Sequence, residues 1–192
     1  GSNGITLTSA DASNNPQVNF SLQSNQKDMI DLVVSDPMDG SNGTMDMTSA
    51  SGTVDFKFLH PLTRVAMEAK TGTDISANTD TKVFITAVSL VHTSKLNSKG
   101  TLDMKALTWA SNTSDYLTSP YALTAASSNG ILNLTAASFA GYTTSSIDIS
   151  SGGTTATSLF PANEYLFLLP VDNATGTAAA GDVQVKIEYD IV

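Results

Sequence analysis

The pattern that most constrains this fold is a regular alternation of apolar and polar side chains. It is clearest in residues 182–192 (DVQVKIEYDIV), where every second residue from Val183 to Ile191 is apolar. Successive side chains of a β-strand point to opposite faces of its sheet, so a period of two predicts a half-buried strand. Chain ends usually fray, but this pattern runs to the last residue. We therefore expect the natural protein to continue past Val192.

A second stretch, residues 54–67, predicts a strand followed by a break. Val54, Phe56 and Phe58 alternate with polar residues. Pro61 then removes a backbone donor and fixes its own φ, which interrupts a strand ladder. Apolar residues resume after the proline, so we expect a strand, a kink and a second short apolar segment on the same core.

Other alternating or continuously apolar runs predict the remaining strands. The run 82–92 is apolar on both faces and is typical of a central strand. The further candidates are 18–22, 28–35, 100–104 and 164–171, with short pieces at 131–134 and 147–149 and one helical turn at 135–139. Charged residues make up 14% of the 192 residues, against about 25% in a typical soluble domain. The sequence therefore predicts an all-β fold, an antiparallel β-sandwich of seven to ten strands.

The domain organisation follows from the same pattern. Residues 1–27 form an N-terminal segment with a candidate first strand, and residues 28–192 form the β-domain. We expect one core, built from the apolar faces of the strongest strands. Its expected members are Phe56, Phe58, Leu62, Val65, Phe84, Val88, Leu90, Leu166, Leu168, Val185 and Ile187.

Composition and motifs exclude several kinds of function. The net charge of −9 disfavours a nucleic-acid partner, whose phosphates would be repelled. The sequence has no cysteine, no paired histidines, no phosphate-binding glycine motif and no nucleophile elbow. No run of eighteen apolar residues predicts a membrane span. We assign no catalytic, cofactor-binding or metal-binding residue, and we expect no enzyme activity and no cofactor.

The few residues that suggest a site each have a simpler interpretation. A zinc site needs three or four ligands, so His60 and His92, the only histidines, are expected to be structural, with His60 hydrogen-bonded in a core strand. The acidic run 36–46 departs from the calcium-loop spacing and indicates a turn. Trp109 and Tyr142 could stack on a sugar if exposed, but a place at the edge of the core is favoured.

Four stretches together resemble a known family. Residues 28–35 (DMIDLVVS) are similar to one of its strands, and residues 100–104, with Trp109 downstream, are similar to another. Residues 165–170 and then 183–189 resemble its closing pair of strands. The most recognisable signature, a strand ending in Phe-x-His-x-Leu-x-Lys/Arg-Val, is filled by Phe58, His60, Leu62, Arg64 and Val65. These stretches, in this order over residues 28–192, resemble the N-terminal domain of the fimbrillins, the type V pilins of Bacteroidales.

The resemblance implies a transthyretin-like β-sandwich and a place in a bacterial surface fimbria. Members are exported as lipoproteins, trimmed by proteolysis and polymerised with other subunits by strand donation. A lipid anchor would then lie upstream of Gly1, and the second, C-terminal domain of the family would be absent from this sequence. Shaft, anchor and tip subunits are not distinguished, and an adhesin would also bind host or bacterial surface ligands.

Two further expectations concern processing and an alternative function. Members are processed after an arginine in an N-terminal extension, whereas the only arginine here, Arg64, is expected to be protected by folding. Processing of that type would precede Gly1. The alternative function is a cell-surface carbohydrate- or protein-binding sandwich outside any fimbria, which an aromatic platform on one face would favour.

Overall fold

The computed structural model describes residues 4–10, 15–35, 57–77, 80–110, 114–123, 130–151, 153, 155–170 and 181–192. Within them, helix is limited to the four-residue α1 (Thr73–Ser76) and a 3-10 turn at Gln26–Asp28. The strands are β1 (Ile5–Thr8), β2 (Gln17–Ser21), β3 (Val34–Ser35), β4 (Phe58–Leu59), β5 (Thr63–Val65), β6 (Glu68–Ala69), β7 (Val83–His92), β8 (Lys99–Asp103), β9 (Thr108–Ala110), β10 (Tyr121–Ala122), β11 (Thr135–Ala136), β12 (Ser145–Asp148), β13 (Thr157–Ser158), β14 (Leu166–Leu168) and β15 (Val183–Ile191).

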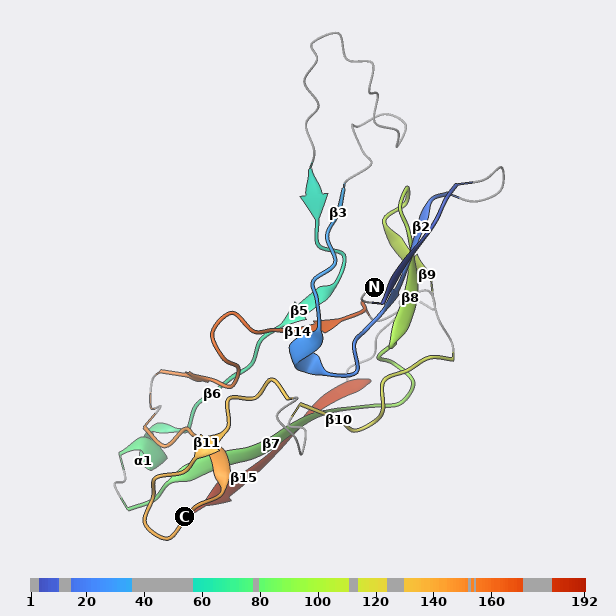
Figure 1. Cartoon of the computed structure of the whole chain (residues 1–192). Helices are drawn as coiled ribbons and strands as arrows, with labels where there is room; N and C mark the ends of the chain where they lie inside the picture. Colours follow the sequence, from blue (N-terminus) through green and yellow to red (C-terminus); the bar gives the residue numbers. More distant parts are fainter. Residues whose placement is uncertain are drawn as a thin grey trace, which may run out of the picture.

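The predicted all-β class is confirmed, and the strands pair antiparallel (Figure 1). They are shorter and more numerous than the seven to ten expected, because extended segments such as 58–69 pair in separate pieces of two or three residues. No helix in the described residues is long and apolar enough to cross a membrane.

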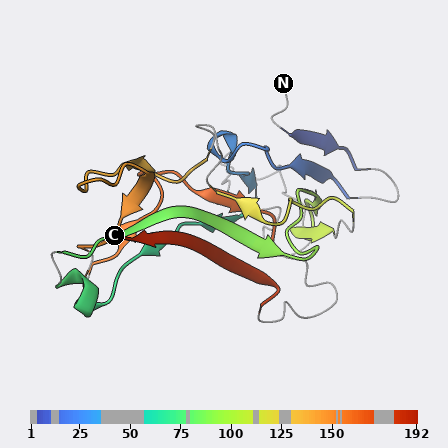
Figure 2. The same cartoon turned by 90° about the horizontal axis from the view of Figure 1, so that it is seen from below.

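The central sheet is built on β7, the strand expected to be central. β10 and β12 pair with β7, β11 pairs with β12, and β15 pairs along nearly the whole of β7. Figure 2 shows β7 and β15 as two long, curved neighbouring ribbons. Val83 and Val88 are buried on one face of β7, and Phe84 on the other face stacks on Tyr142 with ring centroids 4.5 Å apart.

A second layer covers part of this sheet. β5 pairs with β14 and β6 with β13, so the consecutive pieces form one antiparallel ribbon. Its side chains pack with those of β7 in the first hydrophobic cluster, which includes Leu159, Leu166 and Leu168. A separate sheet, in the order β1-β2-β8-β9, builds the second cluster, which includes Phe20 and Leu102.

The expectation of one core is therefore corrected to two clusters. Of the predicted members, Leu62, Phe84, Val88, Leu90, Leu166 and Leu168 are buried, and Val65 is partly buried against the first cluster. Leu62 belongs to the second cluster. Phe56 lies outside the described residues, as do Val54 and the acidic run 36–46.

Three predicted core residues are wrong: Phe58, Val185 and Ile187 are 61%, 53% and 45% exposed. The alternation correctly assigns each of them to an apolar face, but it does not show whether a second layer reaches that face. β4 pairs only with the two residues of β3 among the described strands, and β15 lies beyond the covering ribbon.

Two local expectations are also corrected. Residues 28–35 form a strand only at β3, because other groups take the first backbone donors of this segment. The N–H groups of Asp28 and Met29 donate to the carbonyls of Asn25 and Gln26, and the Ile30 N–H donates to Gln23 Oε1. The helical turn expected at 135–139 is β11 instead, and residues 131–134 form no strand. The break at Pro61 is confirmed, since β4 ends at Leu59 and β5 begins at Thr63.

Candidate functional site: the uncovered face beside β15

The candidate site is the apolar face of β15, which we call the β15 face. It consists of Val185, Ile187, Tyr189 and Ile191, which are 45% to 62% exposed. A strand in a folded domain normally buries such a face, and a contiguous exposed apolar patch usually marks an interaction site. The amphipathic pattern of the sequence thus leads to a surface that has no cover among the described residues.

The β15 face continues the core face of β7. The register places Ile187 opposite Val88, and Tyr189 opposite Ile85. Paired residues of an antiparallel sheet share a face. Val88 and Ile85 are 1% and 2% exposed, whereas their partners on β15 are largely exposed. The covering layer thus stops between the two strands.

A groove lies between the edge of that covering layer and β15. Its walls are residues between Ala69 and Ile75 on one side and Ile187, Tyr189 and Ile191 on the other, with Val83, Ile85 and Ile149 in its floor. The cavity measures about 350 Å³, and Lys70 is the charged residue among those that line it. The volume of this groove and its mainly apolar lining would accommodate several apolar side chains.

Backbone edges border this groove on both sides. Among the described strands, β15 pairs with β7 alone, and the β5–β6 pieces pair only with β14 and β13. Unpaired N–H and C=O groups of an edge strand are a template for a further strand. The site can therefore offer main-chain hydrogen bonds as well as apolar contact.

β15 itself is held firmly. At its start, Lys95 Nζ lies 3.1 Å from Asp182 Oδ2. At its end, the N–H groups of Lys82 and Val192 each donate to the carbonyl of the other residue. The Tyr142 hydroxyl also donates to Asp190 Oδ2 at 2.7 Å. Burial raises the pKa of Tyr142, and this hydrogen bond raises it further, so the phenol stays a donor at neutral pH.

The residues singled out by the sequence lie apart from this groove. His60 is hydrogen-bonded as expected, with Nδ1 2.6 Å from Asp31 Oδ2, but its side chain is exposed rather than in the core. His92 is buried, and its Nδ1 accepts the backbone N–H groups of Lys95 and Leu96. Both histidines are hydrogen-bonded, as expected of structural residues, and the core placement of His60 is wrong.

The aromatic candidates serve internal packing. The Trp109 indole N–H donates to the Pro61 carbonyl at 2.9 Å and its ring packs edge-on against Phe20. Tyr142 stacks on Phe84. Both rings thus have the core-edge role that the sequence favours.

The Arg64 side chain is exposed, so the protection expected from folding does not come from burial of this side chain. Its guanidinium lies 4.4 Å from the centre of the Tyr165 ring. Its backbone is nevertheless part of β5, where Arg64 is paired with Phe167 of β14. Any protection of this position must therefore come from the backbone pairing.

Sequence reasoning placed β15 correctly but missed the groove. The sequence did contain a clue to the groove. Residues 183–191 alternate without a break and were assigned to the core, but no segment that could cover their apolar face was identified. Burial of β15 depends on how far the β5–β6 ribbon extends, and local periodicity carries no such information.

Comparisons with known proteins identify the family. The fimbrillin-like family model matches residues 2–189. The chain is 38% identical to the fimbrium subunit Fim1C of Phocaeicola vulgatus, over 98% of this chain and 48% of that protein. It also resembles the crystal structure of a fimbrial protein from Bacteroides vulgatus, with a TM-score of 0.78 and 36% identity over 98% of this chain and 56% of that one. The chain spans about half the length of these relatives, and it belongs to the fimbrillin-like family.

Proposed function

We propose that this chain is the N-terminal domain of a subunit of a bacterial surface fimbria, and that it accepts an extended segment of a neighbouring subunit in the groove beside β15. The observation that carries the proposal is the uncovered apolar β15 face beside open backbone edges. Strand addition uses both features, because main-chain hydrogen bonds give affinity and alternate side chains give register.

In this function the protein lies on the cell surface as an exported lipoprotein of the outer membrane. Its partners are other fimbrial subunits, in keeping with the fimbrial proteins to which it is similar. A tip subunit would in addition bind a host or bacterial surface ligand. The carbohydrate-binding alternative is not proposed, because Trp109 and Tyr142 are both engaged in internal contacts.

The test compares two substitutions on opposite faces of the same strand. Ile187→Asp places a carboxylate in the groove, whereas Gln184→Asp places one on the other side of β15. Each is introduced into the full-length subunit in a bacterium that assembles it, and incorporation is scored by immunogold labelling of sheared fimbriae.

We expect Ile187→Asp to reduce incorporation at least tenfold, because a carboxylate on the apolar β15 face would lose its hydration when an apolar segment packs against it. Gln184→Asp should remain close to wild type. Thermal unfolding of both variants confirms that each is folded. Equal incorporation of the two variants would contradict the proposed acceptor groove.

A further inference from the structure

The outer edge of β15 is regular as well as open. The register shift in its pairing with β7 lies where Glu188 pairs with Ala87 and Tyr189 pairs with Ile85. The residue left over, Thr86, therefore belongs to β7, and β15 keeps an unbroken alternation. In Figure 2, β15 is the outermost ribbon of its sheet. Such an edge can pair with another strand of regular alternation.

The charges on this edge match a second copy of the same strand. Lys186 and Glu188 are both exposed and lie two residues apart, with Lys186 Nζ 2.6 Å from Glu188 Oε1. If two copies of β15 run antiparallel with Ile187 opposite itself, Lys186 of each copy faces Glu188 of the other. Opposite charges directly across an antiparallel pair are stabilising, and like charges are destabilising.

Neighbouring registers lose this match. Centring the pair on Lys186 places the two lysines opposite each other. Centring it on Glu188 places the two glutamates opposite each other, although each Lys186 then faces Asp190, so this register carries one like-charge pair that the register centred on Ile187 lacks. A shift by one residue instead sets apolar side chains against polar ones, because the side-chain period of a strand is two. A lysine on an edge strand usually discourages pairing with another strand. In this dimer, however, Lys186 of each copy would face Glu188 of the other copy, so the lysine would not oppose the pairing.

The apolar side chains agree with the same register. Val185 of one copy would face Tyr189 of the other, and an aromatic next to a β-branched residue is a favourable cross-strand pair. The β15 faces of the two copies would then join into one continuous apolar surface.

We infer that two copies of this chain dimerise through β15, antiparallel about a two-fold axis at Ile187. Such an interface is isologous, since each copy contributes the same residues. The inference goes beyond the proposed function and does not depend on it, because it rests on the charge pattern of β15. The dimer would occupy the same outer edge of β15 that an added segment would use, so the two associations would exclude each other.

Charge exchange tests the register. By sedimentation velocity over a range of concentrations, we expect wild type to dimerise, and Lys186→Glu and Glu188→Lys each to weaken the dimer about tenfold or more. The double exchange Lys186→Glu/Glu188→Lys should restore it. A mixture of the two single variants should form a heterodimer, since each then faces the opposite charge. Thermal unfolding of each variant establishes that it is folded.

Cross-linking tests the geometry separately. The sequence has no cysteine, so Ile187→Cys should form an intermolecular disulfide under mild oxidation, because the two copies of this position lie opposite each other. Val183→Cys is the matched control: its copies would be eight residues apart along the pair, about 27 Å. A monomer at all concentrations would overturn the inference, as would single charge variants that dimerise like wild type or equal cross-linking of the two cysteine variants.

Discussion

Gly100 in β8 is required by the close approach of a single side chain. A Cβ built at this position would lie 2.9 Å from Cε3 of Trp109, the only tryptophan of the chain. The indole cannot easily move away, because its N–H is bonded to Pro61 and its ring packs against Phe20.

We expect Gly100→Ala to destabilise the chain by about 1–3 kcal/mol, the usual cost of an added methyl group in a packed region. The measurement is equilibrium unfolding in urea. Gly72→Ala is the matched control, because a Cβ added at Gly72 would meet nothing within 4 Å beyond its own chain neighbours. Equal stability of the two variants would show that Trp109 can move.

Asp103 organises the turn between β8 and β9. Its Oδ1 accepts the N–H groups of Lys105 and Ala106 at 2.8 Å, and its Oδ2 accepts the side-chain amide of Asn15. The backbone bond from Ala106, then the bond from Asn15, hold the pKa of Asp103 below its ordinary value of 3.8. The carboxylate is therefore stabilised in its charged form.

This lowered pKa sets the sign of a pH effect. The folded state binds the Asp103 proton less tightly than the unfolded state. The charged carboxylate therefore stabilises the folded chain above pH 3.8, and this stabilisation is lost as the pH falls below that value. In acid unfolding followed by circular dichroism, we expect Asp103→Asn to lack this part of the acid dependence. If the acid-unfolding curves of wild type and variant stayed parallel down to about pH 2, the assignment of this acid dependence to Asp103 would be contradicted.

At the scale of elements, periodicity predicted the strands that pair over long distances. β7, β8 and β15 lie within a residue or two of the expected bounds. It failed where a local turn and the Gln23 side chain take the backbone donors, as at residues 28–30, and it could not show which strands face each other. That is why β15 was predicted as a strand but not as the wall of an uncovered groove.

The β5–β14 pairing gives a prediction about proteolysis. Arg64 is exposed but its backbone lies in a ladder, and a protease needs an extended, unpaired backbone, so cleavage must wait for local opening. We expect the folded chain to resist an arginine-specific protease. Phe167→Pro, which removes a backbone donor opposite Arg64, should accelerate cleavage. The two fragments, 1–64 and 65–192, are resolved by mass spectrometry, and rapid cleavage of wild type would show that β5 is open.

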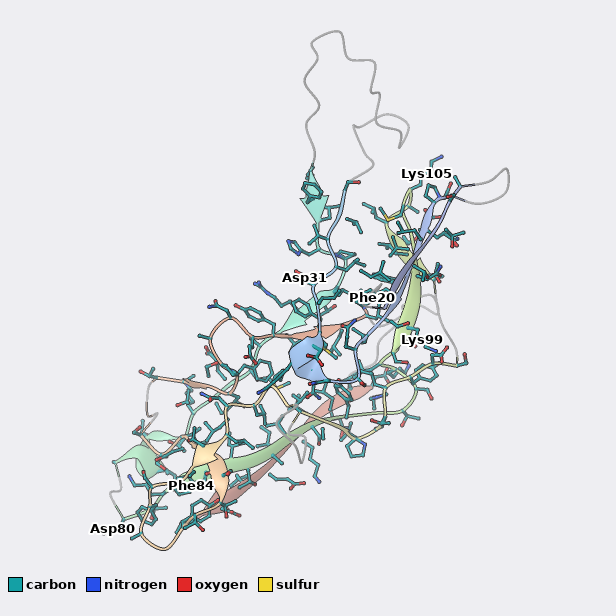
Figure 3. The ribbon with its side chains drawn as sticks, viewed as in Figure 1. Phe20, Asp31, Asp80, Phe84, Lys99 and Lys105 are labelled. Carbon is teal, nitrogen blue, oxygen red and sulfur yellow. The ribbon has the colours of Figure 1, made fainter. Side chains whose placement is uncertain are left out.

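At the scale of the whole molecule, the described residues include few that pack against both hydrophobic clusters. Phe20, a member of the second cluster, and Phe84, which lies in the central sheet but in neither cluster, occupy well-separated regions in Figure 3. Leu22 and Phe167 pack against both clusters. In the described part of the chain, the two sheets therefore have separate cores with a limited contact between them.

This arrangement predicts that damage to one cluster stays largely local. Leu102 and Leu166 are both fully buried, the first in the cluster of the β1-β2-β8-β9 sheet and the second beneath β7. Replacing either by alanine should cost about 2–5 kcal/mol through lost contacts and a cavity. Hydrogen exchange should then rise first in β2 and β8 for Leu102→Ala, while the amides of β7 and β15 stay protected. Leu166→Ala should show the reverse order. If both substitutions raised exchange equally in all these strands, the two clusters would be one cooperative unit, and the β15 groove would depend on the second sheet as much as on its own.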